Sequence, residues 1–172
     1  MQTDPTATDA YLAHNRARAT GPRDLLPMPP ARHTAVVTCM DARLDVYALL
    51  GLSVGDSHVF RNAGGVVTDD VIRSLAVSQR LLGTREIVII HHTDCGMATF
   101  TDEDFLASLE RDAGARPDWV PGCFTDPVDS VRASIARVHA SPFVPHKESV
   151  RGFVLDLRTE LLEEVHAGVP VG

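Results

Sequence analysis

The sequence predicts an α/β fold, with a central, mostly parallel β-sheet of four to five strands flanked by helices and an N-terminal helical arm. Two observations carry this prediction. Short runs of β-branched residues, such as Ala35-Val36-Val37-Thr38 and Ile87-Val88-Ile89-Ile90, alternate with segments whose apolar residues have helical spacing. Capping residues and glycines also mark where several of these helices begin and end. Alternating strands and helices are typical of an open sheet covered by helices.

The first thirty residues are expected to form an arm outside the sheet. Residues 8–19 have a short helical pattern, and prolines and glycines between Gly21 and Pro30 then interrupt the chain. A short helix has little apolar surface to bury by itself, so we expect residues 1–30 to pack on the main body or on a partner subunit. Residues 31–172 then form a single α/β domain, a length that suits one hydrophobic core.

Four apolar segments are predicted to be strands: residues 34–39, 57–60, 86–91 and 152–157. The first and third are almost wholly apolar, as expected for strands buried on both faces of a parallel sheet. Open sheets of this kind bind ligands beyond the carboxyl ends of their strands. If the first and third strands are neighbours, the residues that follow them meet in that crevice.

Helices are predicted where apolar spacing coincides with a start or stop signal. Thr68 or Asp69 caps a helix that stops at Gly83, and Asp126 with Pro127 opens a later one. The two remaining helices of the main domain are predicted over residues 46–50 and 102–112.

Composition and charge exclude several classes of function. The net charge is −7 and the arginines are scattered singly, which argues against a nucleic-acid partner. No apolar stretch is long enough to cross a bilayer, and the first thirty residues mix charges with prolines, unlike a signal peptide. We therefore expect a cytoplasmic protein with no membrane partner. Of the 3 cysteines, Cys123 is expected to be a free, partly buried thiol.

Two clusters follow the central strands and predict a metal site. Cys39 ends the first strand, and His92-Thr93-Asp94-Cys95 follows the third. Either cluster alone is weak, because a cysteine at a strand end is more often a small core residue. Together they supply two thiolates and one imidazole, a set that favours zinc and leaves one coordination position open. Three protein ligands with an open position are typical of catalytic zinc rather than structural zinc.

Residues near these clusters predict a second layer of chemistry. Asp41 lies two residues past Cys39, close enough to reach the metal or its water, and Arg43 is suited to hold a carboxylate through two hydrogen bonds. The alternative is a surface ion pair in a turn. Asn62, Gly64 and Gly65 offer backbone N–H groups near a helix start, which suit a small anion. An ordinary tight turn is the alternative there.

These residues, in this order, resemble the β-class carbonic anhydrases, and the compact length resembles the short prokaryotic branch. The resemblance covers about residues 33–165. The motifs that carry it are Cys39-x-Asp41-x-Arg43, Arg61-Asn62-Ala63-Gly64, Asp70-x-x-Arg73-Ser74-Leu75, His92-x-x-Cys95-Gly96 and the late strand from Gly152 to Asp156.

The resemblance implies one zinc ion per subunit, bound by Cys39, His92 and Cys95, and the reversible hydration of carbon dioxide to bicarbonate and a proton. Asp41 and Arg43 would form a catalytic dyad that orients the zinc-bound hydroxide, and in a closed state Asp41 would be a fourth ligand. The predicted substrate-binding residues are Asn62, Gly64, Gly65, Val66 and Gly96. The resemblance also implies a homodimer or higher homo-oligomer, with active sites at the subunit interface and the N-terminal arm crossing to the neighbour.

Two positions depart from the family pattern. His91 precedes the ligand where many relatives have glycine, so the choice of His92 depends on the His-x-x-Cys spacing. Glu160 stands where a glycine often follows the threonine after the last strand, which argues against a tight hairpin there. Accordingly, Leu161, Leu162 and Val165 are predicted to form only a short amphipathic tail.

Three other functions compete with this interpretation. An enzyme that hydrolyses carbonyl sulfide or carbon disulfide would use the same ligands. A zinc-binding structural or shell protein would have no need of the dyad formed by Asp41 and Arg43. Cysteine nucleophile chemistry, as in phosphatases, requires a longer phosphate loop than the spacing from Cys39 to Arg43 allows.

Overall fold

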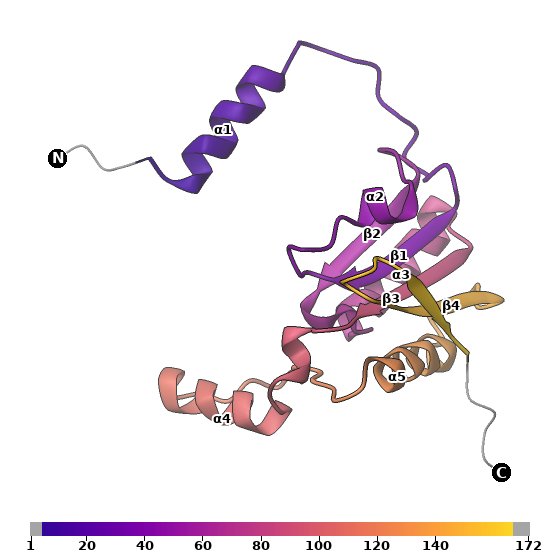
Figure 1. Cartoon of the computed structure of the whole chain (residues 1–172). Coiled ribbons are helices and arrows are strands. Elements are labelled where there is room, and N and C mark those ends of the chain that lie inside the picture. Colours follow the sequence, from indigo (N-terminus) through magenta and orange to yellow (C-terminus); the bar gives the residue numbers. More distant parts are fainter. Residues whose placement is uncertain (1–4, 167–172) are drawn as a thin grey trace.

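A five-stranded sheet forms the centre of the structure, a computed structural model that describes residues 5–166 (Figure 1). The strand order is β2-β1-β3-β4-β5, and every pairing is parallel except that of β4 with β5. The predicted fold class is therefore confirmed, and the first and third strands are neighbours. The strands are β1 (Thr34–Cys39), β2 (Ser57–Asn62), β3 (Glu86–His92), β4 (Ser149–Leu155) and β5 (Leu162–Val165).

The helices begin and end close to the predicted positions. Thr68 accepts a hydrogen bond from the N–H of Val71 at the start of α3, and Gly83 ends that helix in a left-handed conformation. Asp126 caps α5 in the same way, with Pro127 in its first turn. The helices are α1 (Ala7–Arg18), α2 (Val46–Leu50), α3 (Asp69–Leu82), α4 (Asp102–Ala113) and α5 (Pro127–Ala140), and two short 3₁₀ helices are η1 (Ala63–Gly65) and η2 (Gly96–Ala98).

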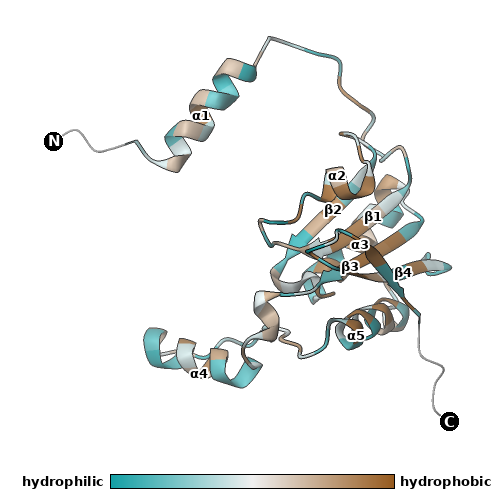
Figure 2. Ribbon diagram, in the orientation of Figure 1, coloured by the Kyte–Doolittle hydropathy of each residue, from teal (hydrophilic) through white to brown (hydrophobic). Residues whose placement is uncertain are grey.

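Two apolar clusters, one on each face of the sheet, form the core. One contains Ile87 and Ile89 of β3 together with buried side chains of α3 and α5. The other contains Ile90 together with Val46 of α2, Cys39 and Cys95. Gly152 of β4 permits the close approach of α5, because a Cβ there would lie 2.2 Å from Cγ1 of Val131. Figure 2 shows the apolar residues concentrated in the strands at the centre.

The segment after β4 corrects two predictions. Residues 162–165, predicted only as a short amphipathic tail, form a strand that pairs antiparallel with β4. The tight turn forms although Glu160 replaces a glycine, because Glu160 adopts a left-handed conformation with φ of 59°. The N–H of Glu160 donates to the carbonyl of Asp156. The N–H of Asp156 donates to the carbonyl of Leu161. These bonds hold the turn closed, although a non-glycine residue is uncommon at positive φ.

The N-terminal arm extends away from the sheet. In Figure 1, α1 is separated from the other helices by an extended segment, and none of its residues is buried. Tyr11, Leu25 and Met28 leave more than two thirds of their surfaces exposed, at 72%, 92% and 81%. The arm therefore presents apolar side chains that nothing in residues 5–166 covers. Across the same residues, the structure contains no helix of the length and apolar character needed to span a membrane.

Candidate metal centre

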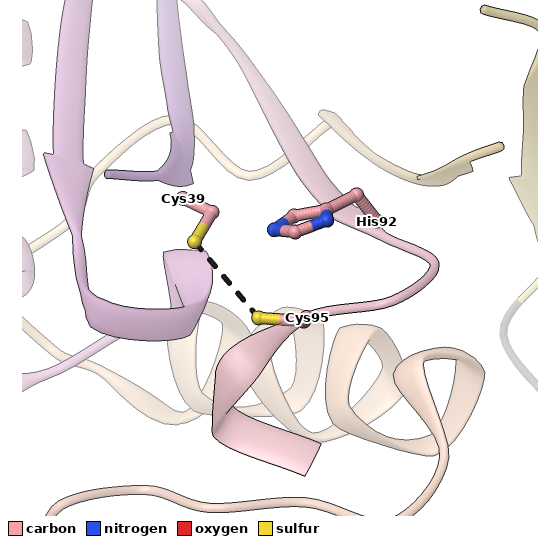
Figure 3. Close-up of side chains that lie close together, drawn as sticks. All are labelled: Cys39, His92 and Cys95. Atoms are coloured by element: carbon pink, nitrogen blue, oxygen red, sulfur yellow. Dashed lines mark hydrogen bonds between the residues drawn. The ribbon is translucent and has the colours of Figure 1, made fainter. Parts of the chain in front are cut away.

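Three side chains suited to bind a metal lie together at the carboxyl ends of the two central strands. Cys39 is the last residue of β1 and His92 the last of β3, and Cys95 immediately precedes η2 (Figure 3). Because β1 and β3 are paired in parallel, residues far apart in the sequence meet at one edge of the sheet. The structure thus brings together the three residues that the sequence predicted as ligands.

The geometry of this group fits a small tetrahedral cation. The two sulfurs of Cys39 and Cys95 lie 4.0 Å apart, and the three potential ligand atoms all lie within 4.8 Å of one another. Zn–S bonds of about 2.3 Å in a tetrahedron place two sulfurs about 3.8 Å apart. Nε2 of His92 is buried and has no hydrogen-bond partner in the described part of the chain. A metal ion bound beside the two sulfurs would supply that partner.

The two adjacent histidines have different roles because successive residues of a strand point to opposite faces. His92 points toward the two cysteines, and Nδ1 of its ring lies 2.8 Å from the carbonyl oxygen of Thr93. That contact places the proton on Nδ1 and leaves Nε2 free to bind a metal. His91 instead lies 3.1 Å, through Nε2, from the carbonyl of Gly65 and stacks on Phe124. Of the two histidines, His92 is therefore the one that lies beside the two cysteines.

The surroundings of Cys39 favour its thiolate. Burial raises the pKa of Cys39, but the adjacent His92 ring and the backbone N–H groups of Asp41 and Gly64 lower it more, so that the net shift is downward. Burial raises the pKa of Cys95, and the neighbouring Cys39 raises it further. Two thiolates this close repel each other unless a cation lies between them, so metal binding would remove a proton from Cys95.

Asp41 and Arg43 form an ion pair beside the group. The guanidinium donates to both carboxylate oxygens, through Nε at 3.0 Å from Oδ1 and a terminal nitrogen at 2.7 Å from Oδ2. Hydrogen bonds from Arg43 hold the pKa of Asp41 far below its usual value. Oδ2 also lies 3.9 Å from Nε2 of His92. An anionic, oriented acceptor therefore stands next to the position that a metal would occupy.

Two residues near the group escaped the sequence-based assignment. Asp94 accepts a second hydrogen bond from the guanidinium of Arg43, at 2.7 Å. Arg61 of β2 donates to the carbonyls of Cys39, at 2.9 Å, and Asp41, at 2.6 Å, and so fixes the loop that carries both. Arg61 belongs to the motif Arg61-Asn62-Ala63-Gly64, and Asp94 lies between His92 and Cys95. These positions in the sequence place both residues near the site. The partners of their side chains, however, depend on how β1, β2 and β3 are arranged in space.

The glycine turn after β2 packs against the group. Gly65 has a φ of 71°, and a Cβ there would lie 2.8 Å from the backbone nitrogen of Cys39, so only glycine fits. This residue packs against the end of β1 rather than lining the hollow described next. The side chain of Asn62 donates to the carbonyl of Val66 at 2.8 Å and thereby closes the turn.

A hollow of about 930 Å³ opens beside Cys39 and Cys95. Asn62, Gly64, Val66 and Gly96, which were predicted to bind the substrate, are among the residues that line it. Aromatic and apolar side chains from η2, α4 and neighbouring loops also line it, and the sequence did not predict them. These are Met97, Phe100, Phe105, Trp119 and Val120. The arrangement places a largely apolar chamber next to the group formed by Cys39, His92 and Cys95.

Comparison with known proteins identifies relatives along most of the chain. The family described as carbonic anhydrase matches residues 34–121. Beta-carbonic anhydrase 1 of Mycobacterium tuberculosis is 58% identical over 93% of this chain and 98% of its own length. A solved carbonic anhydrase from Streptococcus mutans is 43% identical, with a TM-score of 0.87 over 95% of this chain and 100% of that chain. A carbon disulfide hydrolase of Acidithiobacillus thiooxidans is 32% identical over 81% of this chain and 80% of its own length.

Proposed function

This chain belongs to the β-class carbonic anhydrases, and we propose that it hydrates carbon dioxide reversibly by means of one zinc ion held by Cys39, His92 and Cys95. The observation that carries the proposal is the buried Nε2 of His92, which has no protein partner among residues 5–166 and lies beside two thiols. Zinc bound by such a set lowers the pKa of a coordinated water and so supplies a nucleophile at neutral pH.

Asp41 and Arg43 are proposed as the catalytic dyad. Arg43 fixes the Asp41 carboxylate and keeps it ionised, so Asp41 accepts a hydrogen bond but does not donate one. An acceptor in this place orients the attacking oxygen with a lone pair toward the carbon of the substrate. The reaction then adds water to carbon dioxide and yields bicarbonate, and one proton passes to solvent.

The hollow is proposed as the site where carbon dioxide binds. Carbon dioxide carries no charge and is weakly hydrated, so an apolar chamber beside the metal admits it at little desolvation cost. Gly64 and Val66 line the hollow, as Cys39 does. Asn62 and Gly96 are proposed to shape it through their backbone, and Gly65 to hold the turn against the end of β1. Bicarbonate, which is charged, is less favoured there and leaves toward solvent.

A homodimer or higher homo-oligomer is part of the proposal. The exposed apolar residues of the arm, with Trp119 and Val120 at the mouth of the hollow, are surfaces that a second copy of the chain would cover. Residues 1–30 are proposed to pack on that copy, and residues 31–172 to form the enzyme domain. We also propose a cytoplasmic location, because a reducing compartment keeps the cysteine ligands as free thiols.

The test is carbon dioxide hydration, followed by stopped-flow, for wild type and Asp41→Ala, with zinc measured in both. The proposal predicts one zinc per chain in each protein, activity in the wild type and a loss of about 100-fold or more in the variant, since an oriented hydrogen-bonding group is removed. A wild type that holds its full zinc and shows no activity at any pH would overturn the assignment.

Hydrolysis of carbon disulfide is a second candidate function. The relative with that printed name and the wide apolar hollow favour it. Stopped-flow assays with carbon dioxide, carbon disulfide and carbonyl sulfide distinguish the two candidates, because each predicts a different preferred substrate at equal zinc content.

A further inference from the structure

Arg43 has two acidic partners rather than one. On one edge its guanidinium binds the Asp41 carboxylate. On the other edge it donates to a carboxylate oxygen of Asp94 at 2.7 Å and to the Asp94 carbonyl at 2.9 Å. A guanidinium held along two edges by acceptors in fixed positions is oriented in its plane as well as in distance.

The partners of Arg43 come from two different parts of the fold. Asp41 lies two residues from Arg43 on the same loop, so their pairing fixes the two side chains only relative to each other. Asp94 lies on the turn between His92 and Cys95, beyond the end of β3. The contact between Arg43 and Asp94 therefore ties the dyad to the turn that carries two of the proposed metal ligands.

The surroundings of the Asp94 side chain give a further reason to assign it a role. Asp94 has a φ of 55°, in the left-handed region, where aspartate and asparagine are tolerated better than most residues other than glycine. Among the described residues, the only hydrogen-bonding partner of the Asp94 carboxylate is Arg43.

We propose that Asp94 is a positioning residue for carbon dioxide hydration, which holds the Arg43 guanidinium so that Asp41 faces the metal position. The proposal rests on the proposed function, since it acts through the dyad. The contact should contribute little to the free energy of unfolding. The side chains of Asp94 and Arg43 are 80% and 53% exposed, and exposed ion pairs contribute little to folding.

The test uses two substitutions that suit a left-handed residue. Asp94→Gly removes the carboxylate but keeps the hydrogen bond from Arg43 to the backbone carbonyl, whereas Asp94→Asn keeps an acceptor without the charge. We expect kcat/KM for carbon dioxide hydration to fall about 5-fold in Asp94→Gly and about 2-fold in Asp94→Asn, the scale of an exposed ion pair. The loss should lie in kcat, because the apolar hollow is unchanged.

Readouts other than activity separate positioning from a structural role. Zinc content should stay at one per chain and Tm should stay within about 2 °C of wild type, because glycine suits this conformation. Asp129→Asn is the matched control: it breaks the exposed pair with Arg132, of 2.9 Å, on α5 and should change neither kcat nor zinc. In an Arg43→Ala background, Asp94→Gly should have no further effect on kcat/KM.

The outcomes distinguish this inference from the proposed function. An active wild type with an equally active Asp94→Gly variant overturns the role of Asp94 and leaves the proposed function intact. The role of Asp94 is also overturned if Asp94→Gly lowers activity by the same factor in wild type and in Arg43→Ala. It is likewise overturned if Asp94→Gly lowers the zinc content. An inactive wild type with full zinc overturns the proposed function itself.

Discussion

The two sides of the Cys39–His92–Cys95 group are built in different ways. On the charged side, Asp41, Arg43 and Asp94 lie on two short turns and are held by charge-assisted hydrogen bonds. On the apolar side, the hollow is lined mainly by apolar and aromatic side chains that come from separate elements. The charged side therefore depends on the positions of a few atoms, while the apolar side depends on shape and volume. Substitutions on the two sides should change different kinetic parameters.

The largest effect is expected where the two sides meet, at the proposed metal ligands. Cys95→Ser replaces a thiolate by a hydroxyl, which binds zinc weakly, so the variant should lose its zinc and its carbon dioxide hydration together. Metal analysis and stopped-flow assays check this. Cys123→Ser is the control, because Cys123 lies outside the group and is bonded through its backbone N–H to Asp102. If Cys95→Ser retained zinc and activity, the ligand set would be wrong.

The next largest effect is expected on the charged side. Arg43→Ala frees the Asp41 carboxylate, which lies 3.9 Å from Nε2 of His92 and is close enough to turn onto the metal as a fourth ligand. We expect kcat to fall about 100-fold while zinc is retained. X-ray absorption at the zinc edge should detect the added oxygen ligand as the pH is varied. Spectra that match the wild type at every pH would contradict the closed state.

A smaller effect is expected on the apolar side. Val66→Phe fills part of the hollow, so it should raise KM for carbon dioxide about 10-fold with little change in kcat, because a bulky group opposes substrate entry rather than the chemistry. Val77→Phe on α3 is the control, since Val77 lies outside this hollow and is 41% exposed. If kcat of Val66→Phe fell as much as its KM rose, the charged and apolar sides would not control different kinetic parameters.

The smallest effect on catalysis is expected at His91. Its side chain contacts the Gly65 carbonyl and Phe124, and it belongs neither to the Cys39–His92–Cys95 group nor to the lining of the hollow. Burial lowers the pKa of His91 to about 4, below the value of about 6.5 for an exposed histidine. Between these two pH values His91 is protonated in the unfolded chain but neutral in the folded chain. The free energy of unfolding therefore falls as the pH drops from about 6.5 to about 4. The shift corresponds to about 3 kcal/mol.

This acid sensitivity should weaken in a His91→Phe variant. Urea unfolding between pH 7 and pH 4.5 should show a smaller loss of free energy of unfolding in the variant than in wild type, with kcat at pH 8 almost unchanged. His139→Gln on α5, an exposed position, should keep the wild-type slope. If the free energy of unfolding of His91→Phe fell with pH as steeply as that of wild type, groups other than His91 would determine the acid sensitivity.

Local sequence signals predicted most of the fold. The strand over residues 34–39, the caps at Thr68 and Asp126 and the stop at Gly83 depend on residues close in the chain, and the structure has them at those positions. The strand at residues 162–165 was missed, because Glu160 takes a conformation that usually requires glycine. There the pairing with β4 outweighed the local preference.

The candidate site was predictable in part. The side chains of Cys39, His92 and Cys95 meet because the first and third strands are neighbours, which the sequence analysis gave only as a condition. The second partner of Arg43 was not predictable, since it depends on the distance between two turns in space. Likewise Phe105 and Trp119 reach the hollow through α4 and the loop after it, whose placement no local pattern specifies.

The most direct test of the account is the dependence of carbon dioxide hydration on bound zinc. Metal-free protein, prepared with a chelator, is titrated with zinc, and hydration is followed by stopped-flow at each step. The account predicts that activity rises linearly and reaches its plateau at one zinc per chain. Activity without zinc, or a fully loaded protein without activity, would contradict it.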